Sequence, residues 1–151
     1  MSTPISAGRP TRQFLVDRMR AIDRAVTRRV GSALPPDIAA QVSVAHMRLM
    51  AEVPPEGIRP SHLAARLGVS RSAVSQLIHQ LEARDLLERG RDETDRRAEL
   101  VRQTKRAGRG QASARRAIVA IEASWTVRLG ADRMALLEEI LNDLEDWTRG
   151  S

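Results

Sequence analysis

The chain has 151 residues, with 25 basic and 19 acidic side chains, a net charge of +6, a pI near 11.3 and no cysteine. This length fits one domain or one protomer, and the missing thiols exclude disulfide bonds and thiol-based sensing of peroxide. The basic excess favours a polyanionic partner through release of counterions. The polar start MSTPISAGRP and the lack of an apolar run near the ~20 residues that span a bilayer predict a cytoplasmic, nucleoid-associated chain with no membrane partner.

The N-terminal segment is predicted to hold an arm and two helices. Residues 1–10 contain Ser, Pro and Gly and are expected to be disordered. A helix is expected within 11–34, ended by Gly31 and the two prolines after it. Its apolar stripe is Leu15, Met19, Ile22, Val26 and Val30. A second helix is expected over 43–53, ended by another pair of prolines. Its predicted inward residues are Val44, Met47 and Met50.

A helix-turn-helix is the clearest local pattern in the chain. The first helix, starting at Pro60, has an apolar stripe made of Leu63, Ala64 and Leu67. Gly68 follows, where a left-handed residue ends a helix without a Cβ clash. Val69 is expected to be an apolar plug between the helices, and Ser70 is a strong N-cap candidate for the second one. A short Gly-containing turn between two helices is the signature of this motif.

The second helix of the motif has two distinct faces. Its core face is predicted to be Val74, Leu77, Ile78 and Leu81. Its start and opposite face are the predicted DNA contacts: Arg71, Ser72, Ser75, Gln76 and His79. Ser and Gln contact phosphates and base edges, and Gln pairs bidentately with adenine. A solvated polar face explains the same pattern equally well when the helix is taken alone. The preceding turn and the following hairpin favour the DNA interpretation.

A hairpin of the kind called a wing is predicted after this helix. Residues 86–89 lead into a polar loop over 91–97, and 98–101 return as a strand. Asp95 stands two residues before Arg97 and is expected to brace its guanidinium in a narrow minor groove. Arg96 is then placed nearer the phosphates. An ordinary charged hairpin tip is the alternative.

Two more amphipathic helices are predicted at the C-terminal end. The first runs from residue 104 or 111 to 129, with a stripe made of Ala114, Ile118, Ile121, Trp125 and Leu129. The second covers 131–148, with a stripe made of Met134, Leu137, Ile140, Leu141, Leu144 and Trp147. Together with the N-terminal helix they carry more apolar surface than one protomer covers, which predicts a homodimer. A monomeric helical bundle is the alternative.

Residues 57–84 (GIRPSHLAARLGVSRSAVSQLIHQLEAR) and 92–101 (DETDRRAELV) resemble the MarR family of bacterial transcription regulators. The resemblance implies a mainly α fold: a winged helix-turn-helix with a small antiparallel β wing, flanked by N- and C-terminal dimerisation helices. It implies a homodimer that binds double-stranded DNA at an inverted repeat, usually as a repressor, and that a small molecule often releases. It assigns the DNA contacts of the second helix, called the recognition helix, to Ser70, Arg71, Ser72, Ser75, Gln76 and His79, and those of the wing to the residues given above.

The implied domain division has four parts: an arm over 1–10, a dimerisation helix over 11–34, a DNA-binding domain over 35–103 and dimerisation helices over 104–151. Three positions depart from the family pattern. Asp85 stands where Gly is usual, and Arg59 where a Ser or Thr often caps the helix at Pro60. Gln103 stands where an apolar residue usually precedes Thr104, so the exit from the wing is expected to differ.

A pocket for a small-molecule effector is the weakest of these hypotheses. The resemblance places it among the helices that carry Met19, His46, Met50 and Trp125, although such residues are more often plain core. No histidine has metal-ligand spacing, so neither a metal nor a cofactor is predicted. The sequence contains no phosphate loop or nucleophile motif, and no enzymatic activity is expected. The competing function is a winged-helix architectural or protein-interaction module without a ligand switch.

Overall fold

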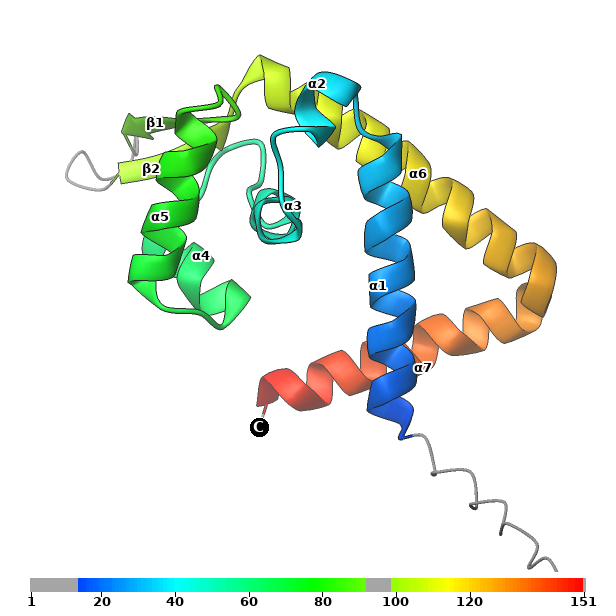
Figure 1. The fold of residues 1–151 in the computed structure, drawn as a ribbon. Coiled ribbons are helices and arrows are strands. Elements are labelled where there is room, and N and C mark those ends of the chain that lie inside the picture. The colour runs from blue at the N-terminus through cyan, green and yellow to red at the C-terminus, as the bar shows by residue number, and fades with distance from the viewer. Residues whose placement is uncertain (1–13, 92–98, 151) are drawn as a thin grey trace, which may run out of the picture.

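The computed structural model describes residues 14–91 and 99–150. The chain forms helices and two strands in the order α1 (Leu15–Ala33), α2 (Pro36–Ala39), α3 (Val44–Ala51), α4 (Pro60–Leu67), α5 (Arg71–Glu82), β1 (Leu87–Arg91), β2 (Glu99–Gln103), α6 (Lys105–Leu129) and α7 (Ala131–Gly150). In Figure 1 the elements α3 to β2 form a winged lobe, while α1, α6 and α7 are long helices beside it. The predicted fold class, mainly α with a small antiparallel wing, is confirmed.

The core of the winged lobe is built from the stripes that the sequence predicted. The side chains of Leu63, Val74, Ile78 and Leu81 are fully buried, together with Leu49 of α3. Burial of one such side chain contributes roughly 1.5–3 kcal/mol. These residues come from three helices, so the core holds α3, α4 and α5 together as one unit.

The turn between α4 and α5 follows the predicted chemistry with one exception. Gly68 is left-handed with φ of 64°, and the Ser70 hydroxyl accepts a hydrogen bond from the Ala73 amide at 3.1 Å. The prediction for Val69 was wrong, because its side chain is 45% exposed and plugs nothing. The fully buried Leu63 and Val74 on either side of the turn already occupy the interior.

The region between α1 and α3 differs from the prediction. α1 continues through Gly31 to Ala33, and Pro36 begins the short α2 instead of breaking a helix, because proline is compatible with the first helical position. In α3 the prediction that Val44 faces inward was wrong: Val44 is 47% exposed, while His46 and Leu49 are buried. The cause is a capping box, in which Ser43 and His46 hydrogen-bond to each other's backbone amides and turn His46 inward.

The long helix α6 starts at the earlier of the two predicted positions. Thr104 caps it by accepting a hydrogen bond from the Ala107 amide at 3.2 Å. Gly110 is buried inside the helix, where an added Cβ would lie 3.3 Å from Cδ1 of Ile38. The glycine therefore allows α6 and α2 to approach each other closely.

The three long helices leave many apolar side chains uncovered in a single chain. α1 has no buried residue at all. Exposed apolar residues on α1 and α7 include Leu15, Ile22, Ile140, Leu144 and Trp147. In Figure 1, α7 turns back from the end of α6 and crosses α1 near its N-terminal end, so that the three helices form an open frame. Among these helices, as throughout the described residues, none is long and apolar enough to span a bilayer.

The left-handed residue after α5 generates a stability prediction. Asp85 has φ of 55°, a conformation that costs an L-residue roughly 1–2 kcal/mol and costs glycine almost nothing. We expect Asp85→Gly to raise the free energy of unfolding, measured in urea, by about 0.5–1 kcal/mol. The neighbouring Ala83 is right-handed, so the control Ala83→Gly should lower it by a similar amount. Equal effects of the two substitutions would contradict the assignment of strain to Asp85.

Candidate nucleic-acid interface

The outward face of α5 is polar and fully accessible. All six predicted contact residues are exposed: Ser70, Arg71, Ser72, Ser75, Gln76 and His79. They lie opposite the buried Val74, Ile78 and Leu81, which hold the other side of the helix in the core. The helix has 12 residues, hence a length of roughly 18 Å. An α-helix of this kind fits the major groove of B-DNA, which is about 12 Å wide.

The wing is a regular two-stranded antiparallel hairpin. β1 and β2 pair from Leu87 with Gln103 at the base to Arg91 with Glu99 at the far end. Leu87 and Val101 are buried and join this hairpin to the core of the lobe. The predicted minor-groove residues Asp95, Arg96 and Arg97 fall between the two strands in the sequence and lie outside the described residues.

Arg89 ties the wing to α5. Its Nε donates to both carboxylate oxygens of Glu82 on α5, at 2.9 and 3.1 Å, and its Nη1 donates to Glu99 on β2 at 2.6 Å. Burial alone would lower the pKa of the Arg89 guanidinium, but the bonds to Glu82 and Glu99 outweigh it and raise the pKa above its ordinary value. The guanidinium is thus charged at every relevant pH and fixes the wing beside the exposed polar face of α5. This ion pair was not predicted from the sequence. A signal was available, because Glu82 at the end of the predicted helix and Arg89 in the strand after it carry opposite charges and are seven positions apart.

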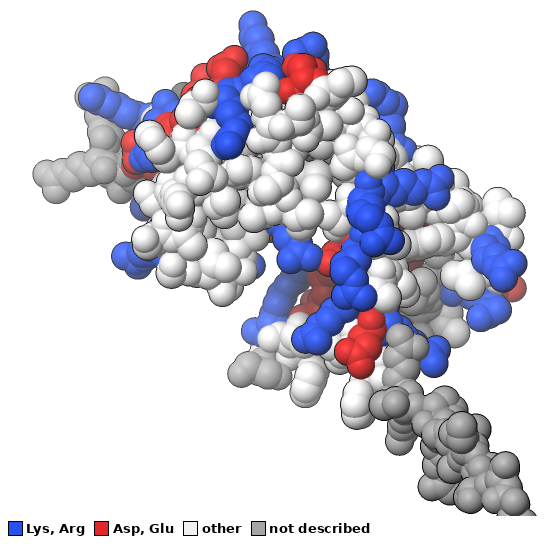
Figure 2. Space-filling model, in the orientation of Figure 1, with Lys and Arg blue, Asp and Glu red and all other residues white. Residues whose placement is uncertain are grey.

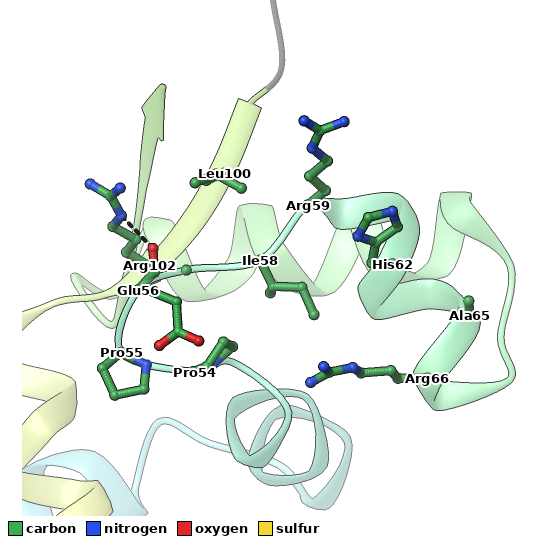
Figure 3. A pocket seen from close by; sticks show the side chains of 11 residues that line it. Pro54, Pro55, Glu56, Ile58, Arg59, His62, Ala65, Arg66, Leu100 and Arg102 are labelled. Atoms are coloured by element: carbon green, nitrogen blue, oxygen red, sulfur yellow. Dashed lines mark hydrogen bonds between the residues drawn. The ribbon is translucent and has the colours of Figure 1, made fainter. Parts of the chain in front are cut away.

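A basic groove lies next to these elements. Its charged and titratable lining is three arginines, one histidine and one glutamate: Arg59, Arg66, Arg102, His62 and Glu56. Figure 3 shows that Arg59, His62 and Arg66 come from α4 and its N-cap, whereas Arg102 comes from β2. The guanidinium of Arg102 donates to the Glu56 carbonyl at 2.9 Å and passes over Gly57, where a Cβ would lie only 2.6 Å from its Cγ. The sequence did not predict this groove.

The basic side chains extend beyond the winged lobe. On the face drawn in Figure 2, Lys and Arg side chains outnumber Asp and Glu side chains, and many of them lie along α1. Some are neutralised in the fold: Arg48 of α3 pairs with Asp23 of α1 at 2.6 Å, and Arg106 and Arg109 of α6 both approach Asp37 of α2. The first pair joins α1 to the winged lobe, and the other two join α6 to α2.

A second cavity, of about 500 Å³, lies between α1, α2, α3 and α6. Most of its lining is apolar: Val30, Leu34, Ile38, Val42, Met47, Met50, Ala51, Leu86, Ala107, Ala114, Ile118 and Val119. Its polar lining residues are Gln111, Arg115 and Glu122. Of the four residues suggested for an effector pocket, Met50 lines this cavity, while Met19, His46 and Trp125 do not.

His46 instead forms a buried polar link between α3 and α5. Its side chain is only 4% exposed, and its Nδ1 accepts a hydrogen bond from the Ser43 amide at 3.0 Å. Because Nδ1 is an acceptor there, the ring proton sits on Nε2, which donates to Oε1 of Gln80 at 2.8 Å. In residues 14–91 and 99–150, no group of three or more His, Asp or Glu side chains is arranged to hold a metal ion.

This link is open to a direct test. We expect Gln80→Leu to lower the free energy of unfolding by about 1–3 kcal/mol, because the buried Nε2–H of His46 loses its acceptor. Gln76 lies one turn earlier on the exposed face of the same helix, so Gln76→Leu should change stability by no more than about 0.5 kcal/mol. Urea denaturation of both variants measures the difference, and equal destabilisation would remove the role given to His46.

The lobe and its flanking helices define a winged helix-turn-helix protein, and comparison with known proteins narrows the class. The family model described as "MarR family" matches residues 41–98. No curated protein matches the sequence. Several solved structures share the fold.

One of them is FabT of Streptococcus pneumoniae in complex with DNA, with a TM-score of 0.70, 20% identity and coverage of 90% of this chain and 96% of that one. CouR of Rhodococcus jostii RHA1, bound to p-coumaroyl-CoA, gives a TM-score of 0.67 at 21% identity, covering 86% and 90%. The PcaV regulator of Streptomyces coelicolor, in complex with its natural ligand, gives 0.60 at 20% identity, covering 97% and 98%. The MarR-family model thus matches the segment over 41–98, and the solved structures show that the chain shares their fold.

Proposed function

We propose that the chain is a sequence-specific, DNA-binding transcription regulator. The observation that carries this proposal is the exposed polar face of α5, held next to a hairpin that Arg89 braces against the same helix. With α5 in the major groove, Ser72, Ser75 and Gln76 would face base edges, and Arg97 would enter the neighbouring minor groove. The structure of FabT with DNA supports this use of the fold.

The regulator acts as a homodimer in this proposal. The exposed apolar residues of α1, α6 and α7 need a cover, and a second copy related by a two-fold axis provides one. The helices 11–34 and 104–151 would then serve dimerisation, and 35–103 would bind DNA. Two copies of α5 about 34–36 Å apart would enter successive major grooves, so the operator would be pseudo-palindromic.

The regulator is further proposed to be a repressor that a small molecule releases. The cavity of about 500 Å³ between α1, α2, α3 and α6 has the size and apolar lining of a small-molecule site. It lies between the proposed dimerisation helices and the winged lobe. An occupant can therefore change the separation or tilt of the two winged lobes of the proposed dimer. Affinity for DNA then falls without any change at the base contacts. The ligand complexes of PcaV and CouR support a ligand-responsive use of this fold.

Selection of duplexes from random DNA tests the proposal. A regulator should enrich one inverted repeat and protect it in a footprint, and unrelated competitor DNA should not displace it. An architectural protein should bind the competitor nearly as well, and a protein-interaction module should enrich no duplex at all. Either of these two outcomes would overturn the proposed function.

Two substitutions separate the groove assignments. We expect Arg97→Ala to weaken binding to the selected duplex and to lower the log-log salt slope by about one unit, because one cation that releases counterions from the duplex is lost. Gln76→Ala should relax the base preference and leave non-specific binding nearly intact. Arg149→Ala is the matched control for charge and should leave the affinity unchanged, because Arg149 lies on the side of α7 away from its apolar stripe and pairs with Glu145 and Asp146 of the same helix. Parent-like binding by both Arg97→Ala and Gln76→Ala would refute the assignments.

The dimer can be tested at α7. Leu144 is 42% exposed within its apolar stripe, so Leu144→Asp places a charge where the partner copy would pack. We expect the sedimentation velocity of this variant to shift to that of a single chain, and DNA affinity to fall with it. Asn142 is exposed on the other side of α7, so Asn142→Asp adds the same charge as a control and should leave the dimer intact. A dimeric Leu144→Asp protein would argue against this interface.

A further inference from the structure

We propose that the backbone carbonyl of Met50 is the junction through which an occupant of the cavity loosens the base of the wing. This inference rests on the proposed function and adds the physical link between its two sites. The link consists of two glutamine side chains, Gln103 and Gln111, that donate hydrogen bonds to the same oxygen.

The junction is the C-terminal end of α3. The last carbonyls of a helix have no partner inside the helix and carry a partial negative charge. Nε2 of Gln103 donates to the carbonyls of Met50 and Val53 at 3.1 and 2.8 Å. Nε2 of Gln111 donates to the Met50 carbonyl at 3.1 Å, and the Val53 amide also reaches it at 3.3 Å.

One glutamine belongs to the cavity and the other to the wing. Gln111 and Met50 both line the cavity between α1, α2, α3 and α6. Gln103 is the last residue of β2 and pairs with Leu87 at the base of the wing. The hydrogen bonds thus join residues 53 and 61 positions apart and bring the cavity wall and the base of the wing onto one peptide group.

The geometry defines the direction of the effect. An occupant that pushes on Met50, or that takes up the amide of Gln111, displaces the shared carbonyl and lengthens the bonds from Gln103. Hydrogen bonds weaken steeply as distance and angle depart from their optimum. The far end of the wing lies four residue steps from Gln103, roughly 13 Å away, so a tilt at the base moves the wing tip most. Occupancy therefore lowers the affinity for DNA.

The start of α3 is attached to α5, the helix that is proposed to enter the major groove. His46, in the first turn of α3, donates to Gln80 of α5. α3 is therefore bonded to α5 near its start and to the wing at its end, and its Met47, Met50 and Ala51 form part of the cavity wall. A displacement of α3 therefore reaches both α5 and the wing. Of these two attachments, only the one at the Met50 carbonyl also receives a hydrogen bond from a residue that lines the cavity, Gln111.

A substitution that fills the cavity replaces the unidentified ligand in the test. Ala114 lines the cavity, so Ala114→Met occupies part of it, whereas Ala112 is exposed on the same helix and does not line it. We expect Ala114→Met to weaken binding to the selected duplex about tenfold, within the usual range of coupling between sites. Ala112→Met, the matched control, should change it less than about twofold. Fluorescence anisotropy measures each Kd.

The decisive measurement repeats these changes in Gln103→Met and Gln111→Met proteins, which keep the side-chain length and lose the donor. In each background Ala114→Met should weaken binding less than about twofold, because the link is already cut. If the roles of Gln103 and Gln111 were merely structural, Gln103→Met and Gln111→Met would lower the DNA affinity or the stability of the protein. Ala114→Met would then still weaken binding about tenfold in both backgrounds. That result, or no effect of Ala114→Met in the parent, would overturn the junction and leave the proposed function standing.

Hydrogen exchange provides a readout that needs no DNA. Ala114→Met should speed exchange of the backbone amides of β1 and β2 in the parent and not in the Gln111→Met protein. Unchanged exchange in the wing refutes the junction even if one variant folds too poorly for binding studies. A parent protein that selects no duplex refutes the proposed function instead, so the two failures are distinguishable.

Discussion

The packing of one face of α5 is the interaction on which the rest of the structure depends. Val74, Ile78 and Leu81 are fully buried, and each contributes roughly 1.5–3 kcal/mol by its burial. Rotation of α5 about its axis would expose these side chains at a cost of several kcal/mol. The polar face is therefore fixed outward although it makes few contacts of its own. Arg89, attached to Glu82 on the same helix, then sets the position of the wing relative to that face.

Features that depend on local rules were predictable from the sequence. The period of α5, the left-handed Gly68 and the Ser70 cap each follow from residues within one or two turns of each other. The wrong predictions concern orientation: Val44 faces solvent because a capping box turns its helix so that His46 enters the core. An apolar period of three or four residues does not distinguish such neighbouring orientations in a helix of only eight residues.

Contacts between distant segments were beyond the sequence. His46 meets Gln80 across 34 positions, and Gln103 meets Met50 across 53, so neither pair follows from spacing along the chain. Gln103 stands where an apolar residue usually precedes the threonine, and an altered exit from the wing was predicted there. In the structure its side-chain amide donates hydrogen bonds to the carbonyls of Met50 and Val53 at the end of α3. Met19 and Trp125 were suggested for a pocket that they do not line, because the cavity depends on how α1 and α6 cross and not on residue type.

In the proposed regulator α1 and α6 would serve two purposes, so a ligand would regulate DNA binding without any contact with α5. One side of α1 and α6 walls the cavity, while other side chains of these helices, such as Ile22 and Val127, stay exposed for the proposed partner copy. In the proposed dimer, packing against the partner copy would fix the part of the cavity wall that α1 and α6 form, while α3, hydrogen-bonded to α5 and β2, contributes another part. An occupant that favours one separation of these walls by about 1.4 kcal/mol shifts the affinity for DNA tenfold. A few apolar contacts in a cavity of this size supply that much free energy.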